Sequence, residues 1–133
     1  MIPRLDENGY LPPGVHVATL EEVVARFGRG SEQREAQAQS LAWLLPLCRA
    51  AGISKLLVNG SFITDRSEPN DVDCVALQGP SYRRHSREAI ELRQGLPFIE
   101  LKVVNERDYQ RFRDIVFASD RAMMSKGLIE IHL

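Results

Sequence analysis

The sequence predicts an α/β (mixed α+β) domain, in which helices pack against one small mixed β-sheet. Two observations carry this prediction. Segments with helical and strand periodicity alternate along the chain. Two strand segments, residues 55–59 and 71–77, also follow each other with only a polar loop between them. Parallel neighbours need a crossover connection, so this pair favours a mixed sheet over a doubly wound parallel one. The length of 133 residues fits one domain spanning residues 1–133.

The N-terminal third is predicted to be an extended arm followed by a short helix. Residues 1–18 contain three prolines, which fix φ and remove backbone donors, so we expect an arm or loop there. Thr19 and Glu22 form a T-x-x-E capping box, which indicates a helix start. Gly28 is then a suitable residue for the end of that helix.

A long helix is predicted over residues 33–51, with Ser31 as its N-cap and Gly52 as its C-terminal stop. Apolar residues recur on one side of this segment, and we expect Trp43 to belong to the core. Pro46 lies inside the segment and should kink the helix or end its first part.

The remaining elements follow from apolar runs and turn residues. The predicted strands are residues 55–59, 71–77, 98–104 and 128–133, and the predicted helices are residues 81–94 and 106–117.

Composition excludes several function classes. The formal net charge is −1, which excludes a protein that coats nucleic acid through bulk positive charge. No apolar run is long enough for a membrane span. The two cysteines, Cys48 and Cys74, lack metal-ligand spacing and are interpreted as buried thiols of a cytoplasmic protein.

Asp71 and Asp73 are the first candidate site residues. They are two apart in a predicted strand, so both side chains leave the same face of the sheet. Adjacent carboxylates repel each other unless a cation neutralises them, and divalent metals do so well. A solvated strand end, or a turn formed after Asn70, explains the same pattern without a metal.

Gly60 and Ser61 follow directly after an apolar strand segment. Glycine permits close backbone approach to a ligand, and the backbone amides with the Ser61 hydroxyl could cradle phosphate oxygens. An ordinary strand-to-loop turn is the alternative.

Glu100 lies between apolar residues in a predicted strand, where glutamate is uncommon. Strand alternation puts Phe98, Glu100 and Lys102 on one face. If this strand neighbours the strand of Asp71 and Asp73, three carboxylates converge. On an edge strand, Glu100 and Lys102 would instead point at water.

Together these segments resemble the nucleotidyltransferase superfamily typified by DNA polymerase β. The resemblance is carried by residues 58–62 (VNGSF), 71–73 (DVD) and 98–101 (FIEL). The chain is also similar to a group of small bacterial proteins assigned to that superfamily. This second similarity is carried by residues 8–16 (NGYLPPGVH), 60–64 (GSFIT), 69–73 (PNDVD) and 126–131 (KGLIEI).

The resemblance implies an Mg²⁺-dependent enzyme that transfers a nucleoside monophosphate from a nucleoside triphosphate (NTP), such as ATP, to a hydroxyl of a protein or RNA. Two Mg²⁺ ions are expected. Asp71, Asp73 and Glu100 would be the catalytic, metal-binding residues. Gly60 and Ser61 would bind the outer phosphates, with Lys102 as a further nucleotide-binding candidate.

The sequence departs from that family in two respects. The third acid is Glu100 rather than the more usual aspartate, and the chain stops after the catalytic module. Small relatives of this kind resemble the antitoxin halves of toxin–antitoxin pairs. A non-catalytic, antitoxin-like module that binds a cognate toxin, or an NTP sensor, is therefore the alternative. The oligomeric state is left open.

One cluster of basic residues and one further lysine are interpreted as having no direct role in the site. Arg83, Arg84, His85 and Arg87 are expected at the start of the predicted helix over residues 81–94, on a solvated face, with RNA binding as the alternative. Lys126 precedes a glycine and is interpreted as a turn lysine, although it could reach a phosphate.

Overall fold

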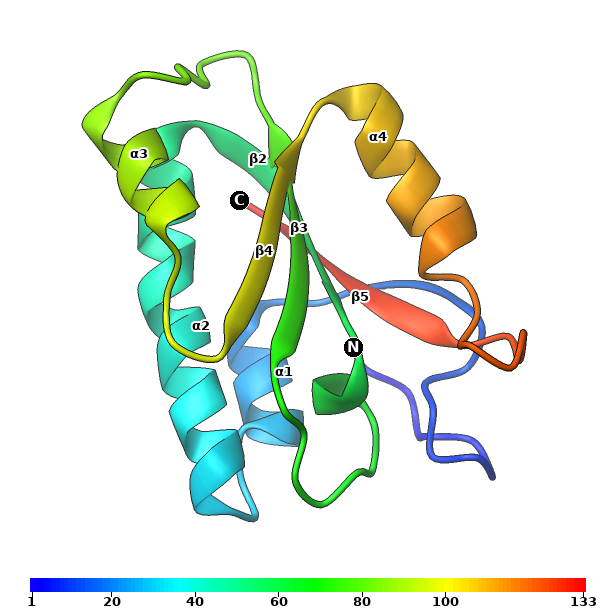
Figure 1. Cartoon of the computed structure of the whole chain (residues 1–133). Coiled ribbons are helices and arrows are strands. Elements are labelled where there is room, and N and C mark those ends of the chain that lie inside the picture. Colours follow the sequence, from blue (N-terminus) through cyan, green and yellow to red (C-terminus); the bar gives the residue numbers. More distant parts are fainter.

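The computed structural model describes residues 1–133. It contains one five-stranded mixed sheet. Its strands are β1 (Gly14–Val17), β2 (Ile53–Asn59), β3 (Val72–Gln78), β4 (Ile99–Val104) and β5 (Gly127–His132). The order across the sheet is β1-β5-β2-β3-β4 (Figure 1). Strand β2 is antiparallel to β3 and β5, whereas the pairs β1–β5 and β3–β4 are parallel. The predicted α/β class with a mixed sheet is confirmed.

Helices cover the two faces of the sheet unequally. The helices are α1 (Leu20–Phe27), α2 (Glu32–Ala51), α3 (Arg87–Gln94) and α4 (Glu106–Arg111). Helices α1, α2 and α3 lie together on one face, and α4 lies alone on the other (Figure 1). None of these helices is both long and apolar enough to cross a lipid bilayer. Because α4 is the only one of these helices on its face, that face of the sheet is only partly covered.

The core is one cluster of 26 buried residues between the sheet and its helices. Cys48 of α2 and Cys74 of β3 are both buried and free in this cluster. The prediction of two buried thiols is thus confirmed.

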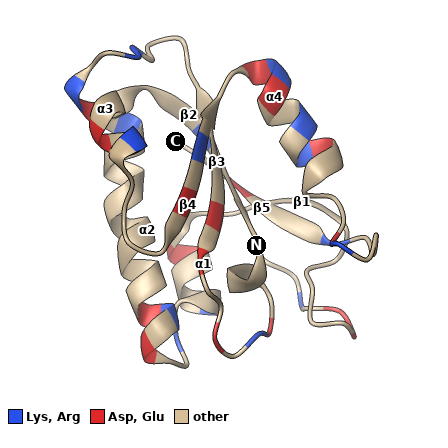
Figure 2. Cartoon of the chain, viewed as in Figure 1, with Lys and Arg blue, Asp and Glu red and all other residues tan.

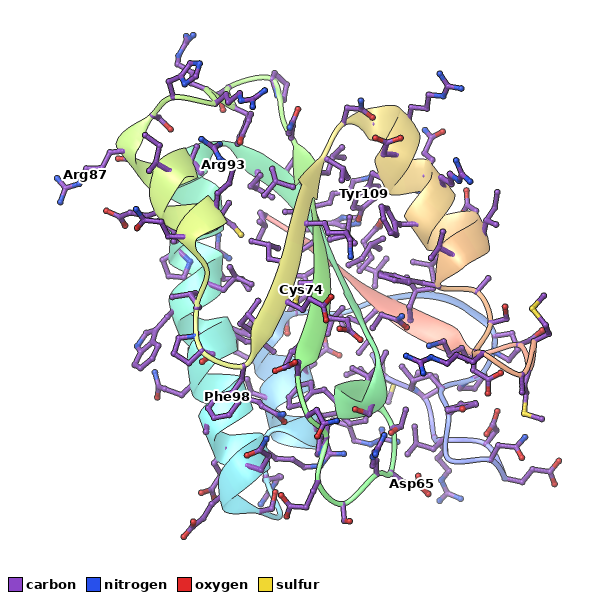
Figure 3. The ribbon with its side chains drawn as sticks, in the orientation of Figure 1. Asp65, Cys74, Arg87, Arg93, Phe98 and Tyr109 are labelled. Carbon is purple, nitrogen blue, oxygen red and sulfur yellow. The ribbon has the colours of Figure 1, made fainter.

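Tyr109 fixes α4 to the open face. Its hydroxyl donates a hydrogen bond of 2.8 Å to the buried carboxylate of Glu130 on β5. The His132 ring stands 2.8 Å from the other oxygen of Glu130, so both carboxylate oxygens have a partner. Tyr109 reaches from α4 towards the sheet in Figure 3.

The local helix signals are confirmed. Thr19 and Glu22 form the expected capping box, and Ser31 accepts a hydrogen bond from the Arg34 amide at the start of α2. Gly52 ends α2 in the left-handed conformation, with φ of 91°. These signals depend on neighbouring residues alone, which explains why they could be read from the sequence.

Other local predictions were wrong. The arm over residues 1–18 contains strand β1, because its last residues pair with β5. Trp43 is 55% exposed rather than in the core. Helix α2 runs through Pro46, so of the two alternatives predicted for Pro46 the end of the helix is excluded. The helix predicted over residues 81–94 begins only at Arg87, after the cap Ser86, so the preceding arginines lie in a turn.

The last helix also differs from its prediction. Residues 112–116 form a wider π-type turn instead of continuing α4. Two apolar residues of this turn, Ile115 and Val116, are 67% and 47% exposed.

Arg34 braces the loop after β2 from within α2. Only 7% of this residue is exposed, and its guanidinium donates hydrogen bonds to four backbone carbonyls. Those carbonyls belong to Phe27, Phe62, Thr64 and Arg66. A buried charge is costly unless its donors are paired, and five donors in a rigid fork suit this arrangement.

We predict that Arg34→Leu lowers the free energy of unfolding by about 3–5 kcal/mol, because buried carbonyls lose their donors. Arg29→Leu is the control, since Arg29 is exposed and should change stability by less than about 0.5 kcal/mol. Urea denaturation measures both values. Equal effects of the two substitutions would contradict the bracing role of Arg34.

Candidate functional site

The parallel pairing of β3 and β4 sets Asp73 beside Glu100. The two residues are register partners, and Asn59 of β2 is the partner of Asp73 on its other side. Figure 2 shows acidic segments of β3 and β4 next to each other, and both acids share a hollow with Val116 and Phe117, which follow α4. The strands β3 and β4 are therefore neighbours, which is the condition under which the three carboxylates were expected to converge.

Asp71 and Ser61 join these acids around one polar hollow. The hollow has a volume of about 590 Å³, and no hydrophobic residue lines it. Asp71, Asp73, Glu100 and Ser61 all line it. The structure thus brings together the three acids and the Gly-Ser segment that were predicted from separate parts of the sequence. We call this space the acidic hollow.

Gly60 packs directly behind Asp73. Its φ is 84°, and a Cβ atom placed on Gly60 would collide with the Oδ2 atom of Asp73. The backbone conformation therefore favours glycine at this position, and a side chain here would displace the Asp73 carboxylate. Ser61 begins the short 3-10 turn Ser61–Ile63, in which Ser61 lines the hollow while Phe62 and Ile63 are buried.

Glu100 and Lys102 behave as the strand alternation predicts, but Phe98 does not. Phe98 lies before β4 with a φ of 64°, so it falls outside the alternating face. Lys102 is exposed, lies 4.0 Å from a Glu100 oxygen, and stands 5.9 Å above the Phe112 ring. It lines a second hollow of about 470 Å³ that shares Asp73 and Glu100 with the acidic hollow.

Burial and the neighbouring acids together raise the pKa of Asp73 to about 6. Burial is the main cause, followed by a hydrogen bond shared with Glu100 and by the negative charges of Glu100 and Asp71. The positive charge of Lys126 acts in the opposite direction. Near neutral pH the site therefore carries unfavourable negative charge, which a bound cation would relieve.

The donor set suits a magnesium ion that shares its ligands with a substrate. All three acids offer carboxylate oxygens, which hard divalent cations prefer. No three His, Cys, Asp or Glu side chains in residues 1–133 are grouped tightly enough to form a complete metal cluster. Magnesium commonly takes only one or two protein carboxylates and completes its shell with water and phosphate oxygens, so the residues present fit this mode.

The sequence interpretation preferred a turn lysine at Lys126, with phosphate contact as the alternative, and in the structure this residue lines the hollows beside the acids. It lines the second hollow beside Asp73 and also the space beside Ser61. It is half-buried, yet no carboxylate lies within ion-pair distance of its amine. Burial lowers its pKa, while the charges of Asp120 and Asp73 act to raise it. A lysine at a turn before a strand carries no sequence signal for this role.

Arg121 and the N-terminal turn complete the walls. Arg121 lines both the acidic hollow and the second hollow. The loop that carries Arg121 is held by Asp120, which accepts a hydrogen bond of 2.7 Å from the Tyr10 hydroxyl. Tyr10 belongs to the NGY segment of the N-terminal turn, and this contact over 110 residues explains what that segment does in the fold. The acids are therefore bordered by cationic residues from two loops, Arg66 after β2 and Arg121 with Lys126 before β5.

Residues 3–132 match the profile of a family of unknown function, DUF6932. The chain belongs to the DUF6932 family. No curated protein and no solved structure matches it. The matched DUF6932 residues include the N-terminal turn, both acidic strands and Lys126, so every wall described above lies within the family region.

We predict that Asp73→Asn stabilises the metal-free DUF6932 protein at pH 7.5. An acid with a raised folded-state pKa binds protons more tightly when folded, so stability falls as pH rises from about 4 through about 6. Removing the charge should add roughly 1–2 kcal/mol at pH 7.5, after allowance for solvent screening, and little at pH 4.5.

Thermal denaturation between pH 4.5 and 8, with EDTA present, measures this difference. Asp71→Asn is the matched control, because Asp71 is exposed and should give a smaller change. A destabilising effect of Asp73→Asn that does not vary with pH would contradict charge crowding at this site.

Proposed function

We propose that this protein is a nucleotidyltransferase, which transfers a nucleoside monophosphate from an NTP to a hydroxyl group of an RNA or protein. The observation that carries the proposal is the register of β3 and β4, which sets Glu100 beside Asp73 in a hollow that Ser61 also lines. The resemblance of residues 58–62, 71–73 and 98–101 to the nucleotidyltransferase superfamily supports it independently.

The cationic residues around the acids suit a triphosphate. Arg66, Arg121 and Lys126 line the hollows on either side of the acids, and none of them forms an ion pair within the protein. Phosphate oxygens accept charge-assisted hydrogen bonds from such groups. The backbone at Gly60 and the Ser61 hydroxyl would hold the outer phosphates, and Lys102 would reach them from β4.

The acids would hold magnesium on the side of the phosphates that faces away from the cationic residues. Asp71, Asp73 and Glu100 would bind Mg²⁺, which when bound offsets the negative charge of the phosphate oxygens. The acceptor oxygen forms a bond to the α-phosphorus, the bond from that phosphorus to the bridging oxygen breaks, and pyrophosphate leaves. Glu100, which is exposed, would accept the proton that the acceptor hydroxyl loses.

Binding without transfer is the second candidate function. Trp43 is 55% exposed on α2, and an exposed tryptophan is typical of a protein interface. A non-catalytic module that docks on a partner such as a cognate toxin, or an NTP sensor, would keep the same fold. In that case the carboxylates would be dispensable for partner binding.

We predict a magnesium-dependent thermal shift with at least one NTP. Ligand at 100 times its dissociation constant adds about 2.7 kcal/mol, which is roughly 10 °C for a domain of this size. Asp73→Asn/Glu100→Gln should abolish the shift, because the metal-bound triphosphate loses its carboxylates. Differential scanning fluorimetry with each NTP, with and without Mg²⁺, makes the measurement.

Glu7→Gln/Glu21→Gln is the control of equal charge change, since both residues are exposed and outside the hollows. It should retain the full shift. The absence of a shift with every NTP, or a shift that survives in Asp73→Asn/Glu100→Gln, would refute the proposed site.

A further inference from the structure

A separate hollow beside the acidic one is rich in arginine. It has a volume of about 330 Å³ and lies among α1, the start of α2 and the loop after β2. Four arginines line it, Arg26, Arg29, Arg34 and Arg66, against two acids, Asp65 and Glu68. We call it the arginine hollow. The predicted site did not include it.

Three of these arginines are available to bind an anionic ligand, because each makes at most one side-chain hydrogen bond within the protein. Arg34 is already engaged with four carbonyls and so forms a fixed wall. Arg26 makes one hydrogen bond of 3.3 Å, to the Ile2 carbonyl, and Arg29 and Arg66 make no side-chain hydrogen bond. None of the four forms an ion pair. Positive charge is therefore in local excess on a chain whose net charge is −1.

The arginine hollow adjoins the acidic hollow. Arg66 lines both spaces. Thr64 and Asp65 line the arginine hollow and also the space beside Ser61. An elongated ligand seated among the arginines can thus pass Arg66 and bring its end to the acids.

We propose that the arginine hollow binds the phosphate backbone of single-stranded RNA, so that an RNA end is the acceptor presented to Asp73 and Glu100. This inference rests on the proposed nucleotidyltransferase function and selects RNA from its two acceptor classes. Guanidinium groups pair with phosphate through two parallel hydrogen bonds, which makes arginine suited to this ligand.

The lining of the hollow favours RNA over a protein acceptor. Only two of its twelve lining residues are hydrophobic, and one of them, Phe27, is buried. Protein interfaces depend on apolar or aromatic anchors in a desolvated centre. Nucleic-acid interfaces are more polar and more positive, as this surface is.

The chain offers a matched control in its other basic cluster. Arg83 and Arg84 are exposed in the turn before α3. Figure 3 shows Arg87 and Arg93 of α3 at the opposite end of the molecule from Asp65, which lines the arginine hollow. Removing two charges at either place changes the net charge equally, so only position distinguishes the two variants.

Fluorescence anisotropy with a labelled ten-nucleotide single-stranded RNA tests the proposal. Arg26→Gln/Arg29→Gln should raise Kd about tenfold at low salt and should reduce the slope of log K against log salt by about 1.4, at about 0.7 for each lost phosphate contact. Arg83→Gln/Arg84→Gln should leave Kd and slope unchanged. Wild-type protein should bind polyglutamate far more weakly than the RNA.

Equal losses in the two variants would overturn the arginine hollow as the RNA site. Failure of wild-type protein to bind the RNA, or equal binding of polyglutamate, would overturn RNA as the ligand class. Arg26→Gln/Arg29→Gln should keep the Mg²⁺-dependent NTP shift, because the acids are intact. Arginine-dependent RNA binding without any NTP shift in wild-type protein would instead contradict the nucleotidyltransferase function alone.

Discussion

The in-register parallel pairing of β3 with β4 is the constraint on which the site depends. It places two carboxylates, Asp73 and Glu100, side by side on a half-open face of the sheet. Like charges in that position repel, and the raised pKa of Asp73 reflects the repulsion and the burial together. Lys102 forms an ion pair of 4.0 Å with Glu100, but no ion pair neutralises Asp73. Arg66, Arg121 and Lys126 line the hollows without an ion pair to the acids, and we propose that a bound cation completes the charge balance.

The surrounding structure keeps this arrangement open. Tyr109 holds α4 over one end of the exposed face through Glu130, and the end with the acids remains uncovered. Arg34 fixes the loop that follows Ser61, and Tyr10 fixes the loop that carries Arg121. Each tether joins segments far apart in the chain. The contacts of Arg34 and Tyr10 therefore hold in place the loops that border the acids.

Short-range features of the sequence predicted much of this structure. The caps at Thr19 and Ser31, the strands β2 to β5 and the D-x-D spacing depend on neighbouring residues and were recognisable. The neighbour of β3 was not predictable, because strand order is decided by the whole sheet. The site role of Lys126 depends on a loop closed by Tyr10 and Asp120, a contact that no local pattern encodes.

Errors in the prediction have physical causes as well. Trp43 sits at helical spacing with core residues but on a side of α2 that nothing covers. The arginine-rich start of the predicted helix over residues 81–94 is a turn, since Ser86 provides the actual cap. Helical periodicity identifies a face, but tertiary packing decides whether that face is buried.

The most direct test of nucleotidyl transfer follows the two ends of the triphosphate separately. Wild-type protein would be incubated with Mg²⁺, cellular RNA and protein, and one NTP labelled at either its α- or its γ-phosphorus. The account predicts that the α-label becomes covalently attached to a macromolecule, that the γ-label leaves as pyrophosphate, and that Asp73→Asn abolishes attachment. Attachment of the γ-label would instead indicate phosphoryl transfer, and attachment of neither label would contradict the enzyme and leave binding as the function of the fold.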